Sequence, residues 1–224
     1  MKNILKYIFL LLIILATSTP EASTQEKRIK GPRIGVDVSG FAWQYFVPSR
    51  KNIGITGDFE INPKYYAVAE AGRLETDRKE ATHHYLSNGY YGKIGFDRNF
   101  LEPQPLSRYD MLYAGFRLGG STLSHQADNI VISDDYWGNY EESIPSHNNR
   151  AFWAEAAAGI KAEVFKNIFM GWSIRGQLML FRQKNTPMKP WLIPGYGKAG
   201  ENTSIFITYT LSYRIPLLRI SENQ

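Results

Sequence analysis

The sequence contains no cysteine. Disulfide bonds, thiolate catalysis and Cys-ligated metal sites are therefore excluded, as is a lipid anchor on a cysteine at a signal cleavage site. After Gln25 there is also no run of about 18 consecutive apolar residues, so no helical membrane span is expected. Lysine and arginine are scattered without a basic run, and the net charge is a modest +5, so nucleic-acid binding is not indicated.

The N-terminus has the order of a secretory signal. Lys2 and Lys6 precede an apolar run over 7–15, and small or polar residues follow as far as Thr24. This order of charged, apolar and small residues is typical of a cleavable signal peptide, and the apolar run is too short for a transmembrane helix. The sequence predicts a signal peptide over 1–24, cleavage before Gln25, and one exported domain over 25–224.

The mature chain alternates between apolar and polar residues with a period of two, which indicates β-strands. Aromatic residues make up 14% of the sequence, and they favour both strands and membrane interfaces. The Ala-rich stretch 154–162 has helical propensity, but its charged residues all occupy odd positions, which favours a strand. The predicted strands are 33–41, 53–61, 65–74, 90–100, 111–123, 152–165, 168–181 and 204–215.

The connections between these strands alternate in length. Those after the second, fourth and sixth strands are short, whereas the others are longer, and the longest spans 124–150. An even number of strands with short turns at one rim and long loops at the other is the plan of an outer-membrane barrel. This plan places both termini in the periplasm and the long loops outside the cell.

Glycines decide which face of the strands lies inside. Alternation alone also fits a soluble barrel with an apolar interior, but eight glycines share the polar face: Gly35, Gly54, Gly72, Gly95, Gly115, Gly119, Gly159 and Gly171. Glycine weakens a strand and has no reason to gather on a solvated surface, whereas a narrow bore needs small residues between large ones. The sequence therefore predicts an all-β fold, an eight-stranded antiparallel up-and-down transmembrane β-barrel with its apolar face toward lipid.

Acidic and basic residues are nearly balanced on the predicted interior face. Unpaired buried charges are costly, so a near balance favours mutual pairing. In a bore that is narrow enough for side chains to fill, these groups form a plug, and a porin-like channel is disfavoured. The predicted interior charges are Arg33, Asp37, Asp58, Glu60, Glu70, Lys93, Asp97, Arg117, Glu155, Lys161, Glu163, Arg175 and Arg214.

Several segments resemble a family of uncharacterised outer-membrane β-barrel proteins, a domain of unknown function typical of Bacteroidetes-type Gram-negative bacteria. They are GVDVSG from Gly35, GDFEI from Gly57, YGKIGFDRNF from Tyr91, MLYAGFRLGGSTLS from Met111, WAEAAAGIKAEVFKNIFMGWSIR from Trp153 and IPGYGK from Ile193. The resemblance covers nearly the whole mature chain. It implies the fold and the outer-membrane location, and it transfers no functional residue.

Catalytic and metal-binding patterns are weak. The histidines His83, His84, His125 and His147 fall in predicted outer loops, with no convincing serine partner and no spacing typical of a metal site. No catalytic residue, cofactor or metal ligand is predicted.

The most distinctive loop feature is an acidic and aromatic segment over 134–142. Its Tyr136, Trp137 and Tyr140 form a candidate partner-contact loop. We expect a non-catalytic structural or accessory component of an outer-membrane complex. The alternative is a lipid A-modifying enzyme of the deacylase or acyltransferase type. Expected partners are membrane lipid, lipopolysaccharide and other outer-membrane proteins.

Overall fold

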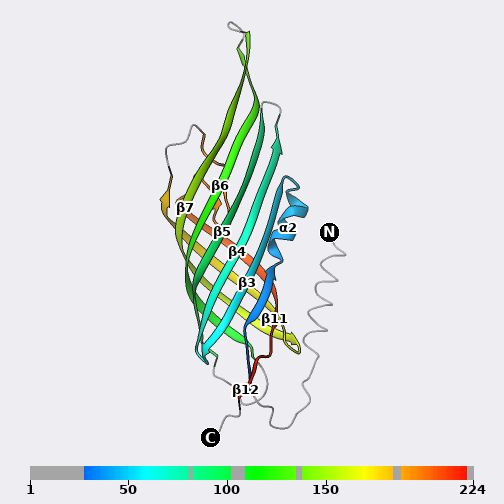
Figure 1. Ribbon diagram of the computed structural model, residues 1–224, viewed down its shortest axis with the longest axis vertical. Coiled ribbons are helices and arrows are strands. Elements are labelled where there is room, and N and C mark those ends of the chain that lie inside the picture. Colours follow the sequence, from blue (N-terminus) through cyan, green and yellow to red (C-terminus); the bar gives the residue numbers. More distant parts are fainter. Residues whose placement is uncertain (1–27, 81–82, 102–108, 135–137, 184–187, 221–224) are drawn as a thin grey trace.

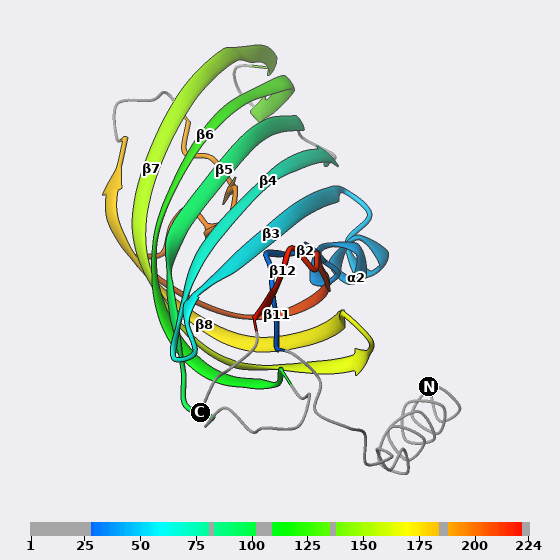
Figure 2. The ribbon, with the colours of Figure 1, turned by 60° about the horizontal axis from the view of Figure 1, so that its bottom comes forward.

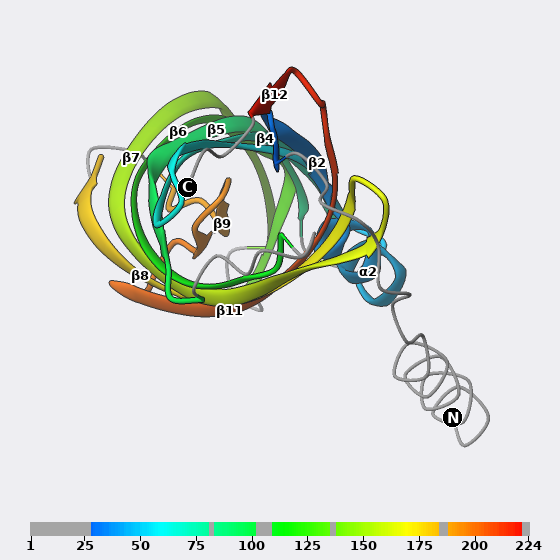
Figure 3. The same ribbon diagram turned by 90° about the horizontal axis from the view of Figure 1, so that it is seen from below.

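A computed structural model describes residues 28–80, 83–101, 109–134, 138–183 and 188–220 (Figure 1). The predicted signal peptide, 1–24, lies outside these residues. Eight antiparallel strands close into a barrel in which each strand pairs with the next along the chain and the last pairs with the first (Figure 3). The predicted fold class is confirmed. The strands are β2 (Arg33–Asp37), β3 (Arg50–Asn62), β4 (Tyr65–Lys79), β5 (His84–Asn99), β6 (Met111–Asp134), β7 (Gly138–Phe165), β8 (Ile168–Arg182) and β11 (Thr203–Arg214).

Tight turns gather at one end of the barrel, which we call the short-turn rim. Between β3 and β4, the side-chain oxygen of Asn62 accepts hydrogen bonds from the backbone N–H of Lys64 (3.0 Å) and of Tyr65 (2.9 Å). Between β7 and β8, Asn167 adopts a positive φ of 65°, a conformation that asparagine tolerates in turns. Local turn chemistry therefore sets the strand register at this rim.

The first predicted strand, 33–41, is wrong at its end. The chain leaves the barrel after Asp37 and forms a helix, α2 (Ser39–Phe46), which packs beside β3 outside the barrel wall (Figure 2). The carboxylate of Asp37 accepts a hydrogen bond from the backbone N–H of Ser39 (2.9 Å) and another from its hydroxyl. Aspartate at this position satisfies free donors of a first helical turn, and that contact ends the strand.

The predicted loop 124–150 is also wrong in its secondary structure, because most of it is strand. β6 and β7 continue to pair beyond the other strands, from Leu123 opposite Asn149 to Asp134 opposite Gly138, with register shifts between His125 and Ile130. They form a ribbon that projects far from the barrel (Figure 1). β4 and β5 also run beyond their predicted ends. Cross-strand hydrogen bonds extend each hairpin through residues whose composition alone suggests a loop.

Two small sheets were not predicted. β1 (Arg28–Lys30) pairs with β12 (Leu218–Ile220), so the two ends of the described chain meet at the short-turn rim. β9 (Leu192–Ile193) pairs with β10 (Gly197–Lys198) within the connection from β8 to β11. Seen along the barrel, β9 lies inside the ring of strands (Figure 3).

The two faces of the wall differ as the alternation predicts. Ile94 and Ile205 point outward and are 68% and 79% exposed, whereas the inward Arg117 and Glu155 are 1% and 0% exposed. Among the residues that the structure describes, no helix is long and apolar enough to cross a membrane.

Inward glycines make room for large rings on neighbouring strands. A Cβ added to Gly72 would lie 2.5 Å from the Tyr91 ring, and one added to Gly119 would collide with the indole of Trp153, which is fully buried. Small and large residues thus alternate across the bore, as close packing of a narrow barrel requires.

We predict that Gly119→Ala destabilises the barrel, because the methyl group forces the buried Trp153 indole to move. Overpacking of this kind costs about 1–3 kcal/mol. Gly176→Ala is the matched control, since nothing lies within 4 Å of a Cβ at that position. Unfolding in urea, followed by tryptophan fluorescence, measures both variants. Equal stability of the two would contradict the packing role assigned to Gly119.

Candidate functional site

The middle of the bore contains a network of ion pairs. Glu155 on β7 accepts a hydrogen bond from Lys93 Nζ at 2.6 Å and lies 3.2 Å from Arg175 Nη1. Arg175 Nη1 also contacts Glu70 on β4 at 2.7 Å, and Arg117 Nε lies 3.3 Å from the same carboxylate. Each side chain here is at most 9% exposed. Strands on opposite sides of the barrel are therefore joined through its centre.

The network continues toward the short-turn rim. Arg117 Nη2 lies 3.0 Å from Asp97, and Lys161 Nζ lies 2.7 Å from Asp58 and 3.8 Å from Asp97. Arg33 Nε donates to the second oxygen of Asp58 at 2.5 Å. Each carboxylate thus faces cations from more than one strand, which offsets the cost of removing it from water.

A separate group lies at the short-turn rim itself. Arg214 Nη2 lies 3.3 Å from Glu163 and 3.2 Å from the side-chain oxygen of Asn167, and its guanidinium stacks 3.4 Å from the centre of the Tyr109 ring. This group ties the end of β11 to the turn between β7 and β8.

The structure places the predicted interior charges as follows. Asp37 is half-buried beside the start of α2, where it accepts a hydrogen bond from Ser39. The side chains of Glu70 and Glu163 are 9% and 13% exposed within their ion pairs. The others are buried inside the barrel: Arg33, Asp58, Glu60, Lys93, Asp97, Arg117, Glu155, Lys161, Arg175 and Arg214.

Above the network, the β9–β10 hairpin folds back into the bore. Ile193 and Tyr196 are buried against Trp153, whose ring centre lies 5.8 Å from that of Tyr196. At its turn, Gly195 has a positive φ of 73° and lies against the ring of Tyr91. Gln177 Nε2 donates to the carbonyl of Gly195 at 2.8 Å. The bore is therefore closed twice, by charge pairs and by an apolar hairpin.

The sequence reasoning missed this hairpin. The sequence predicts a long outer loop between the strands 168–181 and 204–215, and the segment IPGYGK lies within it. A local signal is present, because the apolar residues Trp191, Leu192 and Ile193 directly precede a Pro-Gly turn. Its partner Trp153 is distant in sequence, so the contact itself was not predictable from the segment.

The histidines do not lie in loops as predicted, apart from His83. His84 is on β5, and its Nε2 lies 2.8 Å from a carboxylate oxygen of Asp77. His147 is on β7, and its Nδ1 lies 2.5 Å from the carbonyl oxygen of Pro145. His125 on β6 is buried, with its Nε2 2.6 Å from the side-chain amide of Asn149. Burial lowers the pKa of His125 and favours its neutral form.

The histidine contacts described above do not form a serine–histidine pair. The remaining histidine, His83, lies 3.8 Å from Glu80. Within the residues that the structure describes, no three His, Asp or Glu side chains converge on one point that could hold a metal ion.

Only one of the three predicted partner-contact aromatics lies within the described residues. Tyr140 is on β7, opposite Ile132 on β6. Tyr136 and Trp137 fall in the connection at the tip of the ribbon, outside those residues.

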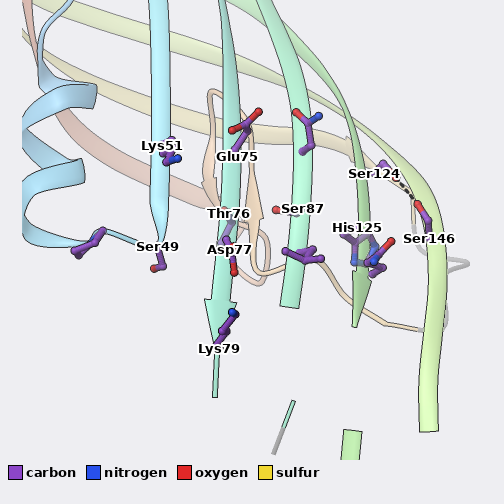
Figure 4. A pocket seen from close by; sticks show the side chains of 14 residues that line it. Ser49, Lys51, Glu75, Thr76, Asp77, Lys79, Ser87, Ser124, His125 and Ser146 are labelled. Carbon is purple, nitrogen blue, oxygen red and sulfur yellow. Dashed lines mark hydrogen bonds between the residues drawn. The ribbon is translucent and has the colours of Figure 1, made fainter. Parts of the chain in front are cut away.

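A polar hollow of about 840 Å³ lies on the extended ends of β3 to β7 (Figure 4). Thr76 and His125 are buried, whereas their neighbours along the strands that line the hollow are exposed or half-buried. Because successive side chains of a strand point to opposite faces, most of the lining belongs to the outer face of the sheet. Ser124 and Ser146 meet through a hydroxyl contact of 2.5 Å. The lining residues are Pro48, Ser49, Lys51, Glu75, Thr76, Asp77, Lys79, Leu86, Ser87, Asn88, Ser124, His125, Gln126 and Ser146.

We predict that Glu155→Ala destabilises the barrel strongly, because Lys93 and Arg175 lose their shared buried carboxylate. Removing one partner of a buried pair costs about 3–5 kcal/mol. Glu75→Ala is the control, since its ion pair with Arg73 is largely exposed, and such pairs contribute at most about 1 kcal/mol. Urea unfolding of both variants is the measurement. A loss at Glu155 no larger than that at Glu75 would mean that the network adds little to stability.

Comparison with known proteins identifies a family and shows similarity to solved structures. The crystal structure of Ail, the attachment invasion locus protein of Yersinia pestis, matches with a TM-score of 0.40 and 12% sequence identity, over 85% of this chain and 99% of that chain. No curated protein matches the chain. A family described as Domain of unknown function (DUF6048) matches residues 1–220. Because that match spans nearly the whole sequence, the chain belongs to the DUF6048 family.

Proposed function

We propose that this protein is a closed outer-membrane barrel that acts as a non-catalytic structural or accessory component of an outer-membrane complex. Its partners would bind the strands that project from the cell surface. The observation that carries the proposal is the combination of a sealed bore with the long β6–β7 ribbon. A sealed bore leaves the outside of the molecule as the place where it can act.

The orientation follows from the connections. Outer-membrane barrels have short turns on the periplasmic side and longer connections outside the cell. The short-turn rim, which also holds the β1–β12 sheet, would then face the periplasm. The extended ends of β3 to β7 would stand outside the cell.

The ribbon offers a backbone surface for a partner. β7 pairs with β8 from Ala151 toward the short-turn rim. Within the described residues, its segment 138–149 pairs with β6 alone, so its second edge is left without a strand neighbour. Such an edge presents unpaired N–H and C=O groups and can accept an extended segment of another chain as an added strand.

The enzymatic alternative needs a nucleophile and a base within hydrogen-bonding reach. Ser87 lies opposite His125 in the register, but Nε2 of His125 contacts the side-chain amide of Asn149 and its Nδ1 has no hydrogen-bond partner among the described residues. The accessory role therefore has the stronger support, and lipid A modification becomes an outcome of the test.

We predict that a photo-cross-linking amino acid at Asn148, on the free edge of β7, captures an outer-membrane protein in intact cells. The same amino acid at Lys64, in the β3–β4 turn, is the control for labelling elsewhere on the barrel. Deleting 130–142 should abolish the capture, because it removes the paired tip of the ribbon. The deletion variant should still fold, as judged by its heat-dependent mobility in gels.

Lipid analysis completes this experiment. If no protein is captured at Asn148 while deletion of the gene changes the acyl chains of lipid A, the accessory role fails and the enzymatic alternative replaces it. If a protein is captured at Lys64 but not at Asn148, the partner binds at the short-turn rim, and this result would also contradict the proposal.

A further inference from the structure

The chemistry of the outer face changes abruptly along the strands. Near the middle of the barrel the outward positions are apolar, as at Ile55 (57% exposed) and Ile94. We call these outward positions the apolar band. The row nearer the projecting ends consists of Ile53, Arg73, Tyr90 and Thr122, which lie opposite one another in the register. The next outward row is fully polar: Lys51, Glu75, Asn88 and Ser124.

With the apolar outward positions in a membrane, this change would place the hollow near the lipid headgroups. Successive outward positions are about 7 Å apart along a strand, at roughly 3.3 Å per residue. The hollow therefore begins within one such step of the apolar band. Arg73 marks the boundary, because its guanidinium lies 5.4 Å from the centre of the Tyr90 ring while its Nε donates to Asn88 at 3.0 Å. Aromatic and basic side chains together are typical of a membrane interface.

The charges in the hollow leave two lysines available. Glu75 is paired with Arg73, and Asp77 is paired with His84 at 2.8 Å. The hydrogen bond with His84 lowers the pKa of Asp77, which favours the carboxylate form of that side chain. Lys51 and Lys79 interact with Asp77 only through longer-range electrostatic attraction, and neither forms a salt bridge with a residue that the structure describes. The hollow thus presents two positive groups whose neighbouring carboxylates already have partners.

The remaining lining is rich in neutral hydrogen-bonding groups. Hydroxyl groups come from Ser49, Ser124 and Ser146, and side-chain amides come from Asn88 and Gln126. Such groups suit the hydroxyls of a sugar, and lysine suits a phosphate. The volume lies within the range of about 300–1,000 Å³ that is usual for sites of small ligands.

We propose that this hollow binds the phosphorylated saccharide headgroup of an outer-leaflet glycolipid, of the lipopolysaccharide class. Lys51, at the end nearer the apolar band, would contact the phosphate closest to the membrane. Lys79, toward the opposite end (Figure 4), would contact a more distant acidic substituent. The acyl chains would lie on the apolar band below. This inference rests on the outer-membrane location proposed above.

The adjacent apolar band favours a lipid over a free sugar phosphate. A soluble ligand would use only the polar wall of the hollow. A glycolipid would also cover outward side chains such as Ile53 and Ile55, so its headgroup and its chains would bind one continuous surface. The open form of the hollow, on the outside of the barrel, suits a ligand that arrives within the plane of the membrane.

The test compares Lys51→Glu/Lys79→Glu with Lys64→Glu/Lys166→Glu, which makes the same charge change at the exposed short-turn rim. The folded barrel in phosphatidylcholine nanodiscs is titrated with phosphorylated lipid A, with dephosphorylated lipid A and with glucosamine phosphate. We expect phosphorylated lipid A to bind the parent and the control equally, and the Lys51/Lys79 variant at least about tenfold more weakly. Dephosphorylated lipid A and glucosamine phosphate should bind weakly to all three.

Lys51→Gln/Lys79→Gln is a milder variant that removes the two positive charges without adding negative ones. Its affinity for phosphorylated lipid A should also fall, by a smaller factor. Equal binding to the parent and the Lys51/Lys79 variants would overturn the proposal. So would a glucosamine phosphate affinity equal to that of lipid A, since that result assigns the hollow to a soluble ligand. Cross-linking at Asn148 is measured in the same variants. If the Lys51/Lys79 variants bind lipid A as the parent does and still capture a protein at Asn148, only the lipid site is overturned. If they bind lipid A as the parent does but no longer capture a protein, the hollow is a protein-binding surface.

Discussion

Neutralisation of charge inside the bore is the constraint on which the rest of this structure depends. Glu155 and Glu70 sit between cations from other strands, and an apolar outer face prevents any of these groups from turning outward. Because side chains alternate along a strand, a slip of one residue would move every charge of that strand to the apolar outer face. The ion pairs therefore select the register of the barrel as well as filling its centre.

A bore filled in this way restricts what the molecule can do. The β9–β10 hairpin adds an apolar layer over the ion pairs, with Tyr196 against Trp153, so water and solutes meet two different barriers. Chemistry that depends on a ligand inside the barrel would have to break both. The useful surfaces are consequently those beyond the apolar band, where the strands continue without a closed wall around them.

The sequence was sufficient to predict the barrel because each pattern that indicates the barrel is local in the sequence. Alternation of apolar and polar residues indicated the strands, and glycines on the charged face, such as Gly119, indicated which side is inside. The errors arose where distant contacts decide the outcome. Asn148 and Asn149 suggest a loop, yet pairing with β6 makes them strand, and Asp37 ends a strand by capping a helix. The position of the β9–β10 hairpin inside the bore depends on its contact with Trp153, which the sequence of the hairpin itself does not reveal. The polar hollow is assembled by the register of five strands, so no single segment revealed it.

The two outer surfaces are not independent of each other. Ser146 lines the hollow and also belongs to the free edge of β7, where it contacts Ser124. A glycolipid headgroup in the hollow would therefore lie next to a partner strand added to that edge. The polar hollow adjoins the apolar band, so in the proposed orientation its height above the membrane would be set by the point along the strands where the apolar outward positions end. Residues that fix the barrel in the membrane would thus also fix the position at which a partner meets the lipid surface.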